Sequence, residues 1–254
     1  MKISVVTVCH NSAATIGRTL DSFFQQDHAD KQLVIVDGAS SDGTLEIIAG
    51  YPQTQIQLIS EPDRGIYDAM NKGLRAFDGE AMGYLNSDDC YHDHQVLSDI
   101  AAALRETDIV FGDIDFVADH ETKRVVRRWT SSPHRPGAFR RGWMAPHPSL
   151  YVRRRVTEAV GEFERRYRIS ADYDWMLRAF EVARFGSRRL RRTFVDMLIG
   201  GASTRSLSSY LIGNLEALAS RRRWLSAGLV DYALIAKPLG KVAQFMPGRA
   251  EAAR

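Results

Sequence analysis

Cysteine is scarce in this sequence of 254 residues, and long apolar runs are absent. The two cysteines, Cys9 and Cys90, cannot build a disulfide framework, so we expect a reduced, cytosolic protein. No segment approaches the roughly 18–20 uninterrupted apolar residues of a membrane span. The apolar run at residues 3–9 is too short for a signal peptide and is typical of a first strand.

Several common site patterns are also missing. No G-x-G-x-x-G follows the first strand, and no G-x-x-x-x-G-K-[ST] occurs, which disfavours ordinary NAD binding and P-loop phosphate transfer. His92 and His94 lie two residues apart but have no further soft ligand nearby. This pattern favours solvated histidines over a zinc site.

The net charge of +3 is small, and with 44% hydrophobic and 26% charged residues the composition is that of an ordinary globular protein. The charge is unevenly distributed. Residues 1–110 carry 7 Lys and Arg against 17 Asp and Glu, whereas residues 111–254 carry 27 against 14. An acidic half suits metal chemistry, and a basic half suits phosphates or an anionic membrane. No nucleic-acid-binding motif accompanies the basic charge, so we expect no nucleic-acid partner.

The first half alternates strand and helix patterns. Such alternation predicts an α/β fold with a mostly parallel, Rossmann-like sheet flanked by helices. The second half is less regular, with a predicted hairpin, a strand, a helix with an apolar face, and a basic helical tail. The expected strands are 3–9, 31–38, 56–61, 81–89, 108–119, 123–129 and 147–154, and the expected helices lie within 10–26, 40–51, 65–77, 169–186 and the tail from Ser206 onward.

Acidic residues follow the predicted strands where ligands bind in such sheets, beyond the strands' carboxyl ends. The neighbouring carboxylates of Asp88 and Asp89 repel each other by about 1 kcal/mol in water and by more in a cleft. Without cysteine or clustered histidine, such a pair suits Mg²⁺ or Mn²⁺. These ions share their coordination with substrate phosphates, which predicts a diphosphate ligand.

Five motifs then carry a resemblance to a known family. They occur in order over about the first 180 residues, and the chain resembles family 2 glycosyltransferases of the GT-A fold, such as those that build bacterial exopolysaccharide, colanic acid or O-antigen. The motifs are SVVTVCHNS (4–12), VDGASSDGT (36–44), DRGIYDAMNKG (63–73), LNSDD (85–89) and GEFERRYRISADYDWMLR (161–178).

The resemblance implies an inverting enzyme that transfers a sugar from a nucleotide-diphosphate donor, UDP- or GDP-linked, to a glycan or lipid-diphosphate-linked acceptor. It implies that Asp89 is the direct metal ligand and that Asp88 assists or contacts the ribose. Gly38 stands where the family often shows a second acid, which leaves base recognition open. The other donor-side residues implied by the motifs are Thr7, Asp37, Asp63, Arg64 and Lys72.

Inversion requires a base that removes the proton from the acceptor hydroxyl. In the family this base is the Asp of a Glu-Asp pair, which here matches Asp172, with Ala171 in place of the Glu. A helix cap is the structural alternative for Asp172. Asp174 matches a further family acid that binds acceptor or supports the loop. His147 and Trp143 are acceptor-side candidates, with a loop histidine and a core tryptophan as the alternatives.

These patterns predict a GT-A domain at 1–200, with a nucleotide-sugar half at 1–110 and an acceptor half at 111–200, followed by a basic helical extension at 201–254. Arginine clusters at 184–192 and 220–242 suggest peripheral binding to the inner face of the cytoplasmic membrane. A solvated helix face is the alternative.

Two other functions compete with glycosyl transfer. A sugar-nucleotide nucleotidyltransferase needs a similar sheet and metal, but it usually carries a glycine-rich basic loop where this chain has HNSAATIGR. A catalytically inactive sugar-nucleotide-binding domain would fit Gly38 and Ala171. The intact acids at Asp88, Asp89 and Asp172 favour the enzyme.

Overall fold

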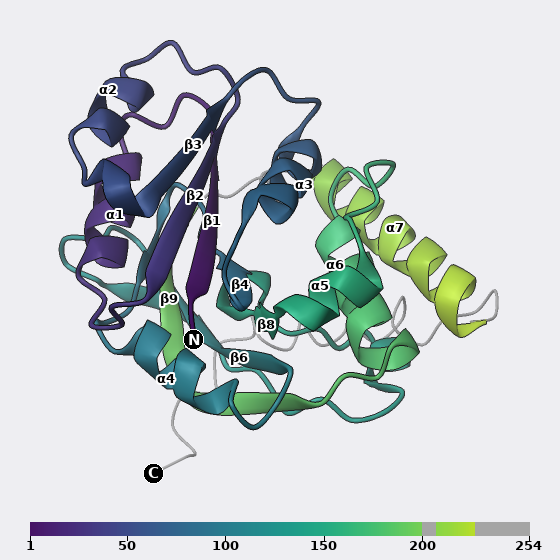
Figure 1. The fold of residues 1–254 in the computed structure, drawn as a ribbon. Helices are drawn as coiled ribbons and strands as arrows, with labels where there is room; N and C mark the ends of the chain where they lie inside the picture. Colours follow the sequence, from purple (N-terminus) through teal and green to yellow (C-terminus); the bar gives the residue numbers. More distant parts are fainter. Residues whose placement is uncertain (200–206, 227–254) are drawn as a thin grey trace.

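The computed structural model describes residues 1–199 and 207–226. Its core is a single nine-stranded sheet with the strand order β3-β2-β1-β4-β8-β6-β9-β5, and β7 pairs with β6 at the side (Figure 1). The strands are β1 (Ile3–Cys9), β2 (Lys31–Asp37), β3 (Ile56–Ser60), β4 (Ala81–Tyr84), β5 (Asp89–Tyr91), β6 (Ile109–Val117), β7 (Val125–Trp129), β8 (Tyr151–Arg153) and β9 (Ser187–Leu198).

The first half forms the predicted parallel arrangement. β1 pairs in parallel with both β2 and β4, and β2 pairs in parallel with β3. Every residue of β1 is buried because helices cover both faces of the sheet, and this burial explains its continuous apolar sequence. The helices are α1 (Ile16–Phe24), α2 (Thr44–Ala49), α3 (Ile66–Ala76), α4 (Val96–Ala103), α5 (Arg154–Val160), α6 (Ala171–Leu177) and α7 (Leu207–Leu225).

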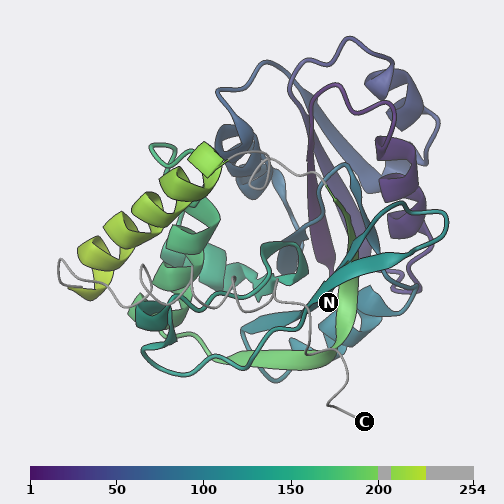
Figure 2. The same ribbon diagram turned by 180° about the vertical axis from the view of Figure 1, so that it is seen from behind.

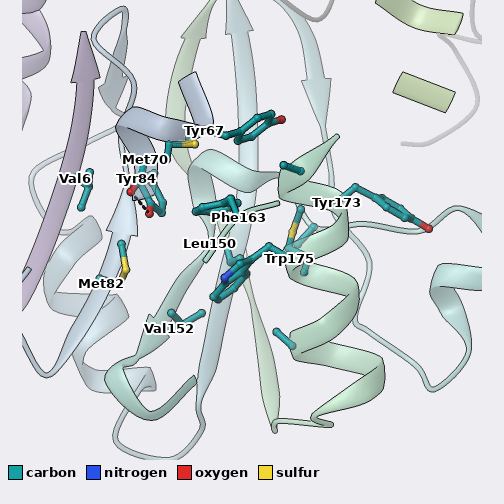
Figure 3. Packing of buried hydrophobic residues seen from close by; sticks show 14 of the residues in the cluster. Val6, Tyr67, Met70, Met82, Tyr84, Leu150, Val152, Phe163, Tyr173 and Trp175 are labelled. Atoms are coloured by element: carbon teal, nitrogen blue, oxygen red, sulfur yellow. Dashed lines mark hydrogen bonds between the residues drawn. The ribbon is translucent and has the colours of Figure 1, made fainter. Parts of the chain in front are cut away.

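Two hydrophobic layers lie on opposite faces of the sheet. On one face, apolar residues of α1 and α4 form one cluster with residues of β1, β2, β4, β6 and β9. On the other face, α3 and α6 enclose an aromatic layer that includes Tyr67, Tyr84, Phe163 and Trp175 (Figure 3). Helices α1 and α2 lie on one side of the β1–β3 strands, and α3 lies on the other (Figures 1 and 2). Helices α3 and α6 therefore lie on the same face of the sheet, on either side of the aromatic layer over β4.

The second half mixes parallel and antiparallel pairing. The predicted hairpin is present as antiparallel β6 and β7, and β8 runs antiparallel to both β4 and β6. The last strand, β9, runs parallel to β6 and antiparallel to β5. Strand β9 places residues 187–198 beside the acidic motif, because Asp89 pairs with Met197.

Residues 184–192, the first of the two basic clusters, fall largely within strand β9, and Arg184, Arg188 and Arg191 are exposed. Four of the five arginines lie within the strand, and three of them form ion pairs with acids, most of which lie in the acidic first half of the chain. The pairs join Arg189 to Asp113, Arg188 to Glu106, and Arg192 to both Asp93 and Asp99. Part of the positive charge of this segment is therefore paired with acids, partly at the surface of the protein, and whether the segment binds a membrane stays a prediction.

Helix α6 is shorter than the predicted 169–186 helix. It ends at Leu177 and continues as a π-helical turn over Arg178–Val182. Arg184 then has a positive φ of 56°, so the chain leaves the helix before Gly186. Ala183, expected on the apolar face, is exposed.

Helix α7 runs alongside α6 on the outside of the molecule (Figures 1 and 2). The predicted helical tail is thus present over Leu207–Leu225, and the rest of the 220–242 cluster lies outside the described residues. None of the described helices combines the length and apolarity that a bilayer crossing requires. The proposed domain boundaries at 110 and 200 stay predictions.

Candidate active site

The acidic pair lies between two strands rather than at the end of one. β4 ends at Tyr84, a short turn follows, and Asp89 opens β5. Asp89 is 1% exposed, and its Oδ2 accepts a hydrogen bond of 2.7 Å from Asn86 Nδ2. Among the described residues, no donor forms a hydrogen bond of ordinary geometry with Asp89 Oδ1, although the backbone N–H of Leu198 lies near enough to the carboxyl to favour its charged form. Burial, and then the negative charge of Asp88, raise the pKa of Asp89 well above its ordinary value.

This pair fits a divalent cation. A buried carboxylate oxygen without a donor is costly, and a bound cation would supply the missing partner and relieve the repulsion from Asp88. Carboxylate oxygens are also the ligands that Mg²⁺ and Mn²⁺ prefer. Asp89 and Asp88 are therefore the residues that would hold the ion.

A second group of potential metal ligands lies nearby, on neighbouring strands. His92, Asp115 and Asp196 place their ligand atoms within 4.8 Å of one another. Here the carboxylates already have cationic partners. Arg128 donates to both Asp115 oxygens over 2.6 and 2.7 Å, and Lys123 Nζ lies 3.3 Å from Asp196 Oδ2. The charges of this cluster are thus balanced by Arg128 and Lys123, although Asp196 Oδ2, like Asp89 Oδ1, accepts no hydrogen bond of ordinary geometry from the described residues.

His92 differs from the solvated side chain that the sequence suggested. Its ring is partly buried, and its Nδ1 lies 2.7 Å from Asp196 Oδ1. The hydrogen bond to Asp196 raises the pKa of His92 above its ordinary value. His94 is exposed, as expected.

Asp37, at the end of β2, contrasts with Asp89. It is fully buried, yet both of its oxygens accept hydrogen bonds. Ser40 donates through its amide and its hydroxyl, and Ser60 donates from β3 over 2.8 Å. Burial alone would raise the pKa of Asp37, but the hydrogen bonds from Ser40 and Ser60 outweigh it and hold the pKa below its ordinary value. Thr7, two residues before the end of β1, is also fully buried.

Gly38 leaves room for an acid from the next loop. A Cβ atom at this position would lie 2.5 Å from Asp63 Oδ2 and 3.3 Å from His10 Nδ1. The Asp63 carboxylate therefore lies against the backbone that follows Asp37, in space that any side chain at position 38 would need. The structure brings Asp63 and Asp37 to the same end of the sheet.

The two donor-side cations have different environments. Arg64 is exposed, and its backbone amide donates to Asp68 over 3.1 Å. Lys72 lies in α3, one turn after Asp68. Its Nζ is 2.8 Å from both Glu61 Oε1 and the Pro62 carbonyl oxygen. Lys72 is thus tied to the loop that carries Asp63 and Arg64.

Asp172 lies at the start of α6, beside the first turn of α3. Its Oδ1 accepts a hydrogen bond of 2.8 Å from the Tyr173 amide and a longer one of 3.4 Å from the Tyr67 hydroxyl. The bond from the next amide differs from an N-terminal cap, which would accept from an amide two or three residues on. The partly buried Asp172 carboxylate keeps Oδ2 for other contacts.

His147 joins Asp172 on the acceptor side. Its ring stacks on Tyr84 at a centroid distance of 5.3 Å, at the carboxyl end of β4. Burial lowers the pKa of His147, and the negative charge of Asp172 opposes this shift without cancelling it. The electrostatic influence of Asp172 on His147 means that the two side chains lie in the same region of the fold, and the burial of His147 favours its uncharged form.

Two other candidates lie away from this edge. Asp174 is fully buried; its Oδ2 accepts from Arg178, and its Oδ1 accepts from Ser220 and Trp224 of α7. Trp143 donates its indole N–H to Ser132 and packs edge-on against Phe111, Phe139 and Phe180. Both residues hold structure together where the sequence left acceptor contacts open.

The sequence missed two residues beside Asp172. Tyr67 lies within the DRGIYDAMNKG motif, but nothing in the motif indicates that its hydroxyl reaches Asp172. Glu216 comes from α7 and accepts three backbone amides at residues 168–170. Its sequence separation of more than forty residues from Asp172 gave no local signal.

Comparison with known proteins identifies the family. Residues 4–179 match the model of glycosyl transferase family 2. The chain belongs to this family. A PGL/p-HBAD biosynthesis glycosyltransferase of Mycobacterium bovis is 32% identical over 184 residues, which cover 70% of this chain and 69% of that protein. The putative glycosyltransferase EpsE of Bacillus subtilis is 26% identical over 97% of this chain and 90% of its own length.

Solved structures confirm the GT-A fold of this glycosyltransferase. TarS of S. aureus in complex with UDP has a TM-score of 0.66 at 19% identity, over 96% of this chain and 71% of that chain. The mannosyltransferase PcManGT of Pyrobaculum calidifontis, in complex with GDP-Man and Mn²⁺, has a TM-score of 0.58 at 18% identity, over 97% and 81%. At these identities the likeness establishes the architecture alone.

Proposed function

We propose that this glycosyltransferase is an inverting, metal-dependent enzyme that transfers a sugar from a UDP- or GDP-linked donor to a glycan acceptor. The observation that carries the proposal is the buried Asp89 carboxylate, with one oxygen unpartnered among the described residues and Asp88 beside it. Asp172, on the neighbouring α6, supplies the base. The Mn²⁺ and the nucleotide sugars bound by structural neighbours are consistent with this assignment.

The chain's own residues divide the chemistry between them. Asp172 removes the proton from the acceptor hydroxyl, and that oxygen then bonds to the anomeric carbon of the donor sugar. The bond from this carbon to the diphosphate oxygen breaks on the opposite face, and the nucleoside diphosphate leaves with the electron pair. A Mn²⁺ or Mg²⁺ ion held by Asp89 and Asp88 would neutralise the charge that develops on the leaving diphosphate.

The remaining site residues support the two substrates. Asp37 shapes the loop that borders the nucleoside, Thr7 lies on the adjacent strand β1, and Asp63 presents a carboxylate beside Gly38. Arg64 and Lys72 lie on the diphosphate side. On the acceptor side, the neutral His147 can donate or accept a hydrogen bond next to Asp172.

A donor panel tests the reaction class. Thermal unfolding would be measured with UDP-, GDP- and dTDP-sugars, each with and without Mn²⁺, since a ligand that binds the folded state raises the melting temperature. One nucleotide should stabilise the protein, and only with the metal. Asp172→Asn should keep that stabilisation and lose sugar transfer. Full activity of Asp172→Asn would remove the base assignment.

The acceptor proposed here is a lipid-linked glycan of bacterial surface polysaccharide synthesis, reached by peripheral binding to the inner face of the cytoplasmic membrane. The outer face of α7 supports this. Leu211 and Leu215 are 61% and 62% exposed one turn apart, and the exposed Arg223, which pairs with Glu164, follows on the same helix. Exposed leucines next to basic residues suit an anionic lipid surface.

Vesicle sedimentation tests the membrane interaction. The full chain should bind vesicles that contain anionic phosphatidylglycerol and should bind neutral phosphatidylcholine vesicles less. Replacing Leu211 and Leu215 together by serine should weaken binding without changing donor binding. Equal binding to both kinds of vesicle, or no effect of the double substitution, would contradict this part of the proposal.

A further inference from the structure

The turn that leads into α6 is held by a single carboxylate of α7. Glu216 Oε1 accepts the amide of Arg168 over 2.7 Å, and its Oε2 accepts the amides of Ile169 and Ser170, each over 2.9 Å. Three consecutive backbone N–H groups thus converge on one side chain. Hydrogen bonds to a charged acceptor are about twice as strong as neutral ones, so this contact fixes the backbone just before Asp172.

Helix α7 approaches this turn closely at Gly213. A Cβ atom at position 213 would lie 3.1 Å from Ile169 Cγ2 and 3.3 Å from Ser170 Oγ. Ser170 Oγ also donates to the Gly213 carbonyl oxygen over 2.9 Å. Glycine therefore permits the close approach that brings Glu216, one turn further along, under the amides of the turn.

The opposite side of the same turn is held from the donor half. The Tyr67 hydroxyl lies 2.6 Å from the Ile169 carbonyl oxygen and 3.4 Å from Asp172 Oδ1, so its single proton is donated mainly to Ile169. Tyr67 belongs to the first turn of α3, the helix that also carries Lys72. Ile169 is thus bound through its amide to α7 and through its carbonyl oxygen to α3.

We propose that Glu216 and Tyr67 are positioning residues that hold the turn at 168–172 between α7 and α3 and so fix the Asp172 carboxylate relative to the donor. The inference rests on the proposed role of Asp172 as the base. The inference assigns a function to α7. This helix lies beyond residue 179, where the family match ends, and its Glu216 holds the backbone next to the proposed base. A displacement of about 1 Å at a reacting group can reduce turnover about 100-fold.

Three variants separate positioning from folding. Glu216→Ala removes all three acceptors, whereas Glu216→Gln keeps the shape but retains one carbonyl oxygen and turns an NH₂ group toward the remaining amides. Tyr67→Phe removes only the hydroxyl. The matched control is Glu164→Gln, because Glu164 also binds α7, through Arg223 over 2.7 Å, at an exposed ion pair that does not touch the turn.

The first readout is amide hydrogen exchange, which requires no substrate. Glu216→Ala should accelerate exchange at residues 168–170 at least tenfold while the sheet keeps its protection, and Glu216→Gln should have a smaller effect in the same place. Glu164→Gln and Asp172→Asn should leave these amides unchanged. Unchanged exchange at 168–170 in Glu216→Ala would overturn the proposal, whatever the activity.

The second readout is kinetic and uses the donor identified by the nucleotide panel. Glu216→Ala should lower kcat about 10- to 100-fold with an unchanged KM for the donor, Glu216→Gln and Tyr67→Phe should lower it less, and Glu164→Gln should keep kcat within twofold. Faster exchange with unchanged kcat would also overturn the proposal. Full activity of Asp172→Asn would instead refute the base assignment, and the exchange data would still stand.

Discussion

Asp37 and Asp89 are both buried aspartates at the same edge of the sheet, and their environments are opposite. Asp37 accepts from Ser40 and Ser60, and its pKa is held low. Asp89 accepts from Asn86 at one oxygen, lies beside Asp88, and has a raised pKa. The negative charge of Asp37 is stabilised by hydrogen bonds within the fold. The negative charge of Asp89 is not, and a bound cation would stabilise it.

The largest expected effect is the loss of metal-dependent nucleotide binding in Asp89→Ala. This substitution removes the carboxylate proposed as the direct ligand, so Mn²⁺ should no longer promote binding of UDP or GDP, as measured by isothermal titration calorimetry. His92→Ala is the matched control, because its cluster has balanced charges, and should bind as the parent protein does. Metal-promoted binding that survives in Asp89→Ala would assign the cation to another site.

Asp37→Ala should have the opposite pattern of effects. The substitution strands the buried donors of Ser40 and Ser60, so the free energy of unfolding should fall by about 3 kcal/mol. Binding of Mn²⁺ should change little at temperatures where the variant stays folded. Urea denaturation gives the first quantity and calorimetry the second. A stable Asp37→Ala variant that loses metal binding would reverse the roles assigned to the two acids.

The sequence indicated this sheet edge but could not separate the two acids. Continuous apolar runs predict buried parallel strands, and acids after such strands meet at one edge. Whether an acid is satisfied depends on distant groups: Ser60, which bonds Asp37, lies on the next strand, and Met197, which pairs with Asp89, lies more than a hundred residues away.

Long-range contacts also limit what could be predicted in the second half. The sequence could not show that some arginines of β9 are ion-paired, because their acidic partners, such as Asp113 and Asp99, are remote in the sequence. Asp172 was predicted from a motif, whereas its supports were not. Tyr67 and Glu216 come from helices about one hundred residues before it and more than forty after it.

The pH dependence of stability should differ in sign between the two acids. The folded-state pKa of Asp37 is lowered, so its stabilising contribution is present above the unfolded value of about 3.9 and is lost as pH falls through the folded pKa. The folded-state pKa of Asp89 is raised, so its ionisation destabilises the metal-free protein as pH rises from about 3.9 through the folded pKa.

Asp89→Asn isolates the second effect. In the absence of metal at pH 8, it should raise the free energy of unfolding by about 1 kcal/mol, since it removes a charge that is disfavoured first by burial and then by the repulsion from Asp88. For a chain of this size, that is about 2–4 °C in melting temperature. The gain should shrink toward pH 4, where the parent carboxyl is protonated. A gain that is constant from pH 4 to pH 8 would mean that charge is not its cause.

The smallest expected effect is the loss of the hydrogen bond from Ser60 to Asp37. Ser60→Ala removes one of its hydrogen bonds and should cost about 0.5–1 kcal/mol of unfolding free energy, measured by urea denaturation. In the Asp37→Ala background the same substitution should cost less than that or even be mildly favourable, because the Ser60 hydroxyl then has no acceptor there. A coupling energy near zero in this double-mutant cycle would show that Ser60 does not satisfy Asp37. The contrast with Asp89 would then rest on Ser40 alone.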